Sequence, residues 1–236
     1  MKRLLCLLFA LLLCTGCAGA EQAFSLLGEP LTGTHSFSGD GSQLTYSLPQ
    51  LSANDDVSAT INRFYGERVV QLKALWQTDE WQDASGDLSY AMTYGDHRYV
   101  SIAFTLLRSA GNGEIATLWA DTFAMDGLYA GQKLCLSQLL GLEDESDDGE
   151  GPSLASQLAY RLVWQIVSQE SLNPDGDYLD GLTEQQVQNA FDPEQDFYLD
   201  EDGNVVFFIQ SGEIAGEIAG ILEYPFSIAE MLSAVE

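Results

Sequence analysis

The stretch that decides the fold is DFYLDEDGNVVFFIQSGEIAGEIAGILEYPF, residues Asp196 to Phe226. Two apolar runs, Phe197–Leu199 and Val205–Ile209, flank the turn sequence DEDGN. Aromatic and β-branched runs around a turn that contains Asp-Gly predict a β-hairpin. The second run is apolar at every position, so we expect a central strand that is covered on both faces.

Two helices are predicted ahead of this hairpin. Pro152 suits a first helical turn, and apolar residues at helical spacing follow over Ser153–Glu170. A second, shorter helix is predicted over Thr183–Phe191, with Thr183 as its N-cap. The two helices and the hairpin make up a predicted C-terminal module, residues 153–236.

The preceding module, residues 43–142, begins with an alternating strand that stops near Pro49. From about Asn54 to Gln77, apolar side chains recur at three- and four-residue spacing, which predicts one long amphipathic helix. Three strand-like runs bounded by turn residues then predict an antiparallel meander over 88–94, 98–108 and 114–125. We therefore expect an α+β fold: antiparallel sheet elements packed with one long N-terminal helix, plus a C-terminal helix-helix-hairpin module.

Residues 1–20 have the pattern of a signal peptide. A basic start precedes an apolar run of about ten residues, which is too short to span a bilayer. Cys17 lies in a lipobox-like sequence and would be lipidated, whereas cleavage after Ala20 would release a secreted form. Either route predicts export, to the outer face of the cytoplasmic membrane as a lipoprotein or into the medium. Residues 21–42, rich in glycine, are interpreted as a tether.

The charge of the chain is strongly one-sided. It has 9 Lys and Arg against 36 Asp and Glu, a formal net charge of -27. Nucleic acid is excluded as a natural partner because its binding needs a basic patch. A cationic partner would be attracted over a distance, although the same charge also serves the solubility of an exported protein.

Two acidic segments are candidates for binding such a partner. The first is the acidic loop, residues 143–152, and the second is the turn of the predicted hairpin, called the hairpin tip below. The candidate residues are Asp144, Glu145, Asp147 and Asp148 in the acidic loop and Asp200, Glu201 and Asp202 at the hairpin tip. That both segments are merely solvated turns remains an open alternative.

No catalytic or metal-binding constellation is recognisable. His35 and His97 have no zinc-site spacing, and carboxylate pairs are expected by chance among 36 acids. Asn173–Glu184 offers oxygens at calcium-loop positions, but Tyr178 stands where an EF-hand needs glycine. We therefore expect no enzyme activity, no metal and no cofactor, with an uncharacterised hydrolase as a remote alternative.

The residues also carry a family resemblance. The order FYL, acidic-Gly turn, VVFFI, EIA, AG and YPF resembles the C-terminal module of RsiV-type anti-sigma factors, a domain of unknown function also found in PdaC-type peptidoglycan deacetylases. GQKLCLSQLL, residues 131–140, is similar to a segment of the module before it, and the two matches cover roughly residues 43–232. Many relatives carry Gly-Ala-His near the middle hairpin, where this chain has Gly113–Ala116, GEIA.

In RsiV-type proteins the paired modules are the extracytoplasmic sensor for lysozyme, a basic enzyme. The resemblance thus implies an extracytoplasmic binding module that captures or senses lysozyme or another cationic wall-active protein, and the lipobox-like sequence at Cys17 adds the expectation of a lipid anchor. In PdaC-type enzymes the same modules precede a deacetylase domain, which implies an accessory peptidoglycan-binding protein of cell-wall remodelling as the alternative. Neither a sigma-binding region nor a deacetylase domain is recognisable in the sequence.

Overall fold

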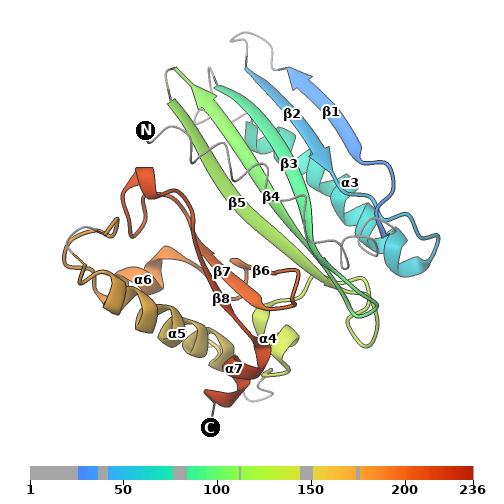
Figure 1. Ribbon diagram of the computed structural model, residues 1–236. Coiled ribbons are helices and arrows are strands. Elements are labelled where there is room, and N and C mark those ends of the chain that lie inside the picture. The colour runs from blue at the N-terminus through green and yellow to red at the C-terminus, as the bar shows by residue number, and fades with distance from the viewer. Residues whose placement is uncertain are drawn as a thin grey trace.

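The computed structural model describes residues 26–36, 42–76, 84–111, 113–143, 151–173 and 176–235. Within these ranges the chain forms two β-sheets and five α-helices, which confirms the predicted α+β class (Figure 1). None of the helices in these ranges has the length and apolar composition needed to cross a membrane.

The large sheet has five strands in the order β1-β2-β3-β4-β5. They are β1 (Leu31–Ser36), β2 (Gln43–Leu48), β3 (Ala84–Gly95), β4 (Tyr99–Ala110) and β5 (Gly113–Ala124). Strands β3, β4 and β5 form the predicted antiparallel meander. Strands β2 and β3 pair in parallel, which corrects the expectation of antiparallel elements. The cause is helix α3 (Asp56–Trp76), which connects them, because parallel neighbours require such a crossover.

Strand β1 corrects the tether prediction for Leu31–Ser36, within residues 21–42. It pairs antiparallel with β2, and Gly33 lies opposite Tyr46. A Cβ atom at Gly33 would stand 2.4 Å from the Tyr46 hydroxyl oxygen. Glycine is therefore needed so that the tyrosine ring can lie across the strand, and its presence in the sequence does not signal a linker.

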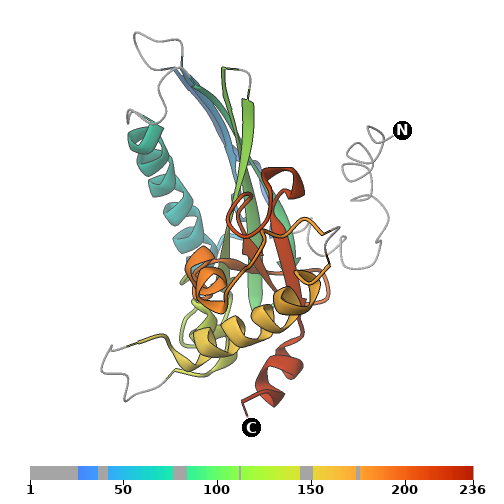
Figure 2. The ribbon, with the colours of Figure 1, turned by 90° about the vertical axis from the view of Figure 1, so that its left-hand side faces the viewer.

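Helix α3 covers one face of the large sheet, as Figures 1 and 2 show from two directions. It occupies the region where the sequence places a helix from about Asn54 to Gln77. Tyr65 is 1 % exposed, and its ring lies 5.6 Å from that of Phe104 on β4 and 5.8 Å from that of Phe123 on β5. This aromatic stripe is therefore core packing between the helix and the sheet.

The small sheet is antiparallel, in the order β6-β7-β8. Its strands are β6 (Phe197–Leu199), β7 (Val205–Ile209) and β8 (Leu222–Phe226). The predicted hairpin is confirmed, since β6 and β7 pair with Tyr198 opposite Val206. Strand β7 is central and buried at all five positions, as its apolar sequence predicts.

Four helices and one 3₁₀ turn surround the small sheet. They are α4 (Leu136–Leu140), α5 (Leu154–Glu170), α6 (Glu184–Ala190), η3 (Glu217–Ala219) and α7 (Ile228–Ser233). Thr183 caps α6, as predicted, by accepting the N–H of Gln186. The helices and the small sheet share one apolar core, in which Val163, Phe207 and Met231 are fully buried.

Glu194 connects the first turns of α4 and α5. Its carboxylate accepts hydrogen bonds from the Ser137 N–H at 2.9 Å, the Ser137 hydroxyl at 2.6 Å and the Ser156 hydroxyl at 3.2 Å, and also from the Ser153 hydroxyl. Burial acts to raise the pKa of Glu194, but the hydrogen bonds from Ser137 and Ser153 outweigh it and hold the pKa below its ordinary value. Glu194 is therefore a charged carboxylate that links the starts of helices α4 and α5 through hydrogen bonds.

The small sheet packs on the face of the large sheet opposite α3. A buried cluster joins them: Leu118, Ala120 and Phe208. The side-chain amide of Gln210, just after β7, bonds the main chain of Leu118 twice: Nε2 donates to its carbonyl oxygen at 2.6 Å, and Oε1 accepts its N–H at 3.1 Å. The modules predicted at 43–142 and 153–236 therefore share a buried interface.

Candidate functional site

The acidic charge is concentrated in the C-terminal segment, defined here as residues 151–236. It contains 16 Asp and Glu residues and a single basic residue, Arg161. Among its described residues no carboxylate forms an ion pair, and Arg161 donates to the carbonyl oxygen of Ala234 at the end of α7. The negative charge of this segment is therefore largely uncompensated by the fold.

The hairpin tip joins β6 to β7, and its three acids have different surroundings. The Asp200 carboxylate accepts the N–H groups of Asp202 at 3.0 Å and Asn204 at 2.9 Å, and the Asn204 amide at 3.0 Å. These hydrogen bonds stabilise the turn, since aspartate side chains in turns often accept N–H groups of the residues that follow. Glu201 and Asp202 are exposed and remain candidates for contact with a partner.

The other predicted site residues fall outside the described part of the chain. These are Cys17 and the acidic-loop residues Asp144, Glu145, Asp147 and Asp148. Their relation to the hairpin tip stays a prediction. Glu143, which precedes them, is described, and both of its carboxylate oxygens accept the Tyr129 hydroxyl, at 2.7 and 2.8 Å.

A groove between α5, β8 and α7 lies on the surface of the C-terminal segment. Its volume is about 220 Å³. Its apolar lining comes from Leu162, Ile166 and Phe226. Its polar lining comes from Gln165, Gln169, Glu170 and Glu230. We call it the α5–α7 groove; it combines an apolar surface with two carboxylates and no basic residue.

A chain of hydroxyl groups positions one of these carboxylates. The Tyr178 hydroxyl donates to Glu170 Oε2 at 2.7 Å and lies 3.2 Å from the Tyr224 hydroxyl. Burial is the main cause that raises the pKa of both tyrosines, to about 12 for Tyr224 and further for Tyr178. Both hydroxyls therefore keep their protons at neutral pH, so Tyr224 can donate to Tyr178 while Tyr178 donates to Glu170.

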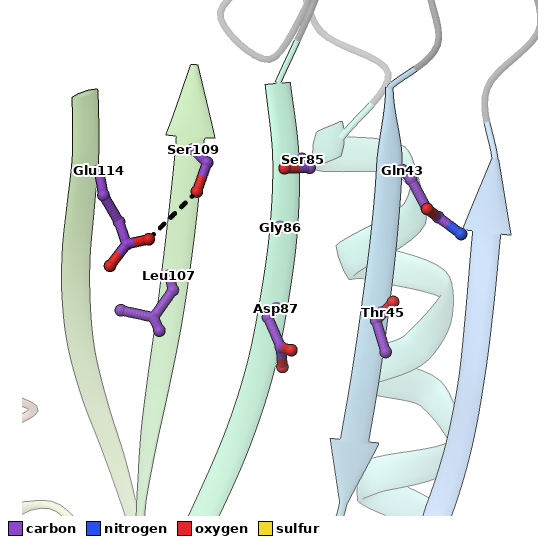
Figure 3. Close-up of a pocket in the computed structure, with 8 residues that line it drawn as sticks. All are labelled: Gln43, Thr45, Ser85, Gly86, Asp87, Leu107, Ser109 and Glu114. Atoms are coloured by element: carbon purple, nitrogen blue, oxygen red, sulfur yellow. Dashed lines mark hydrogen bonds between the residues drawn. The ribbon is translucent and has the colours of Figure 1, made fainter. Parts of the chain in front are cut away.

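A shallow hollow occupies the upper part of the large sheet, on the face opposite α3 (Figure 3). Its volume is about 330 Å³, and its polar side chains come from four neighbouring strands: Gln43, Thr45, Ser85, Asp87, Ser109 and Glu114. Gly86 and Leu107 complete the lining. The Ser109 hydroxyl donates to Glu114 Oε2 at 3.3 Å. We call it the sheet-face hollow; it is rich in hydroxyl groups and has no basic side chain.

One buried ion pair lies under α3. Asp121 on β5 is fully buried, and Lys133 Nζ stands 2.8 Å from its Oδ1. Burial raises the pKa of Tyr65, and the nearby negative charge of Asp121 adds to the rise. Asp121 is enclosed by the core, whereas Lys133 is partly exposed, and we assign the pair to stability.

The remaining reactive groups are dispersed. His35 lies on β1 and His97 in the β3–β4 turn. Cys135, at the N-cap of α4, is half-buried, and burial raises the pKa of its thiol. Across the described ranges no three His, Cys, Asp or Glu side chains are grouped as metal ligands.

Solved structures show a similar fold. A DUF3298 family protein from Pseudomonas aeruginosa PAO1 aligns with a TM-score of 0.54 and 10 % identity over 86 % of this chain and 91 % of that chain. The fold is therefore similar to that of this DUF3298 family protein. A member of the DUF3298 family from Bacteroides fragilis NCTC 9343 aligns with a TM-score of 0.48 and 13 % identity over 89 % of this chain and 98 % of that chain. No family model and no curated protein matches the sequence.

The DUF3298 likeness concerns the architecture alone, because so few residues are identical. It is compatible with a pair of modules of unknown function. The groove and the hollow were not accessible to sequence reasoning, because their residues come from separate elements. The alternation of Ser and Thr along β2 and β3 is the one signal that could have indicated a hydroxyl-lined face.

Proposed function

We propose that the chain is an extracytoplasmic binding module of the RsiV-like type that captures or senses lysozyme or another cationic wall-active protein. One observation carries the proposal: the C-terminal segment has 16 acids and one base, and the base is bonded to a main-chain carbonyl. Such a surface steers cationic proteins toward itself and favours complementary contacts at the rim of an interface. The residue-level resemblance to RsiV-type proteins supports the same partner.

The proposal places the module outside the cytoplasm. It is anchored by lipid at Cys17, or secreted after cleavage following Ala20. In this proposal the chain binds and performs no catalysis of its own, and it needs no metal or cofactor. The acidic loop and the exposed acids of the hairpin tip, Glu201 and Asp202, would contribute to the attraction.

The first test is binding of residues 21–236 to C-type lysozyme, measured by calorimetry across a salt series. We expect submicromolar affinity that persists near physiological salt, because docked groups are screened less than exposed charges at a distance. An acidic protein of unrelated fold is the control. Weak binding that disappears with modest salt would be charge attraction alone and would contradict the proposal.

A second candidate function is suggested by the sheet-face hollow. Its hydroxyl, amide and carboxylate groups on a flat sheet can accept and donate hydrogen bonds to the hydroxyls of a glycan. This favours the alternative of an accessory peptidoglycan-binding protein of cell-wall remodelling. The absence of aromatic side chains from the lining makes it the weaker candidate.

Sedimentation with purified peptidoglycan tests this second function. We expect the wild-type chain to sediment with the wall and Asp87→Ala/Glu114→Ala to sediment several-fold less, because two hydrogen-bonding groups of the hollow are lost. The matched control is Thr32→Ala, an exposed residue on the same face of β1 outside the hollow. Equal sedimentation of all three proteins would exclude the hollow as the wall-binding site.

A further inference from the structure

The α5–α7 groove has the composition of a pocket for a long basic side chain. Leu162 and Phe226 are buried beneath it, and Ile166 is half-buried. Lysine and arginine lay their aliphatic stems along apolar surface while the charged group stays at the rim. Here the rim offers carboxylates from two helices, Glu170 in the last turn of α5 and Glu230 in the first turn of α7.

The size of the groove restricts what it can hold. Its volume of about 220 Å³ lies below the ~300–1,000 Å³ of pockets that bury drug-sized ligands. It is therefore better matched to one side chain of a docked protein than to a free cofactor. The two glutamine amides, Gln165 and Gln169, add acceptors for a multivalent donor such as a guanidinium group.

Glu170 is held in place before any partner arrives. Tyr178 donates to its Oε2, while no donor among the described residues bonds its other oxygen, Oε1. Tyr224, which is 4 % exposed, supports Tyr178 from the core. A carboxylate with one oxygen fixed and the other open loses little freedom when it binds a cation, which favours affinity.

The only base of the C-terminal segment is engaged with a main-chain carbonyl and forms no ion pair with either rim carboxylate. Arg161 precedes Glu170 by nine residues on α5, a separation of roughly 14 Å along the helix axis. Its guanidinium group is engaged with Ala234, where it ties α7 to α5. No intramolecular cation therefore fills the position between the two carboxylates, as far as the described residues extend.

We propose that the α5–α7 groove receives a basic side chain of the cationic partner, with its stem against Phe226 and its charged group between Glu170 and Glu230. This inference rests on the proposed function and assigns it a contact point. Glu170 and Glu230 bind the cation directly, and Tyr178 is a positioning residue that acts through Glu170.

The test compares two variants that remove the same charge. Glu170→Gln/Glu230→Gln changes the groove, and Glu213→Gln/Glu217→Gln changes two exposed acids of the same segment near η3. Binding of residues 21–236 to C-type lysozyme is followed by surface kinetics near physiological salt. We expect the groove variant to lose at least about tenfold in affinity through faster dissociation, and the control to lose about twofold or less through slower association.

The Tyr178→Phe variant tests independently whether Tyr178 positions Glu170. It leaves the net charge unchanged and removes the hydrogen bond to Glu170, so we expect affinity to fall about threefold to tenfold with an increased dissociation rate. In the Glu170→Gln/Glu230→Gln background the same change should add no further loss. An equal loss in both backgrounds would overturn the positioning of Glu170 by Tyr178.

The outcomes separate the two proposals. If the wild-type chain does not bind lysozyme even at low salt, the proposed function fails. If the wild-type chain binds and the groove variant dissociates no faster than the control variant, the function stands and the groove inference is overturned. Thermal unfolding of each variant verifies that the groove variants are folded at the temperature of the assay.

Discussion

Lys133→Met is expected to lower the free energy of unfolding by about 3 kcal/mol. The change leaves the Asp121 carboxylate fully buried without its cation, and breaking a buried pair in this way costs about 3–5 kcal/mol. The lower end applies because the Lys133 side chain keeps 26 % exposure. Chemical denaturation at neutral pH measures the change.

Two further variants make this result interpretable. Lys73→Met removes a lysine of α3 that stands over the Tyr46 ring at 5.8 Å, and we expect a loss below about 1 kcal/mol. Asp121→Leu/Lys133→Met replaces the pair by apolar groups and should recover most of the loss. A Lys133→Met protein as stable as the Lys73→Met control would show that Asp121 does not depend on its partner.

Glu194→Gln is expected to have the second-largest effect, a loss of about 2–3 kcal/mol. The carboxylate accepts hydrogen bonds from Ser137, Ser153 and Ser156, whereas an amide offers one acceptor and turns its NH₂ group toward donors. The first turns of α4 and α5 lose a shared partner. Denaturation at pH 7 measures the loss, and Glu184→Gln on the exposed face of α6 is the matched control.

The pH dependence of this loss is also predicted. The folded-state pKa of Glu194 lies below its ordinary value of 4.5, so its contribution is fully present above that value. It disappears as the pH falls through the lower, folded-state pKa, where the carboxylate becomes protonated. The stability gap between the wild-type chain and Glu194→Gln should therefore be constant above about pH 6 and should narrow below pH 4.5. A stability difference between the two proteins that does not change with pH would argue against a charged Glu194 that links the two helices.

Local sequence patterns predicted most of the fold. The hairpin, the central burial of Val205–Ile209 and the antiparallel meander follow from residue periodicity and turn chemistry, which act within a few residues. Strand β1 was missed because Gly33 by itself indicates a linker. The glycine leaves room for the Tyr46 ring of the neighbouring strand, a contact that the sequence alone does not show. The parallel pairing of β2 and β3 was missed because the path of α3 over the sheet is a tertiary property.

The candidate site was less predictable from the sequence. Composition indicated an acidic surface but could not show that Asp200 is engaged in its own turn while Glu201 and Asp202 are exposed. The position of Glu170 at the rim of the α5–α7 groove depends on the hydrogen bonds that join Tyr178 to Glu170 and to Tyr224, three residues that come from a loop, a helix and a strand. Such contacts arise from packing and leave no periodic signal.

The pair of hydrogen bonds between the Gln210 side chain and the Leu118 main chain has a consequence for self-association. Strand β5 is an edge of the large sheet, and an edge strand with open N–H and C=O groups is a template for pairing with another chain. The Gln210 amide presents the same donor and acceptor as a peptide unit and occupies one such position on β5. A side chain of the same protein thus occupies the N–H and the carbonyl group of Leu118 that a strand of another chain would need. This protects β5 from intermolecular strand addition at this point.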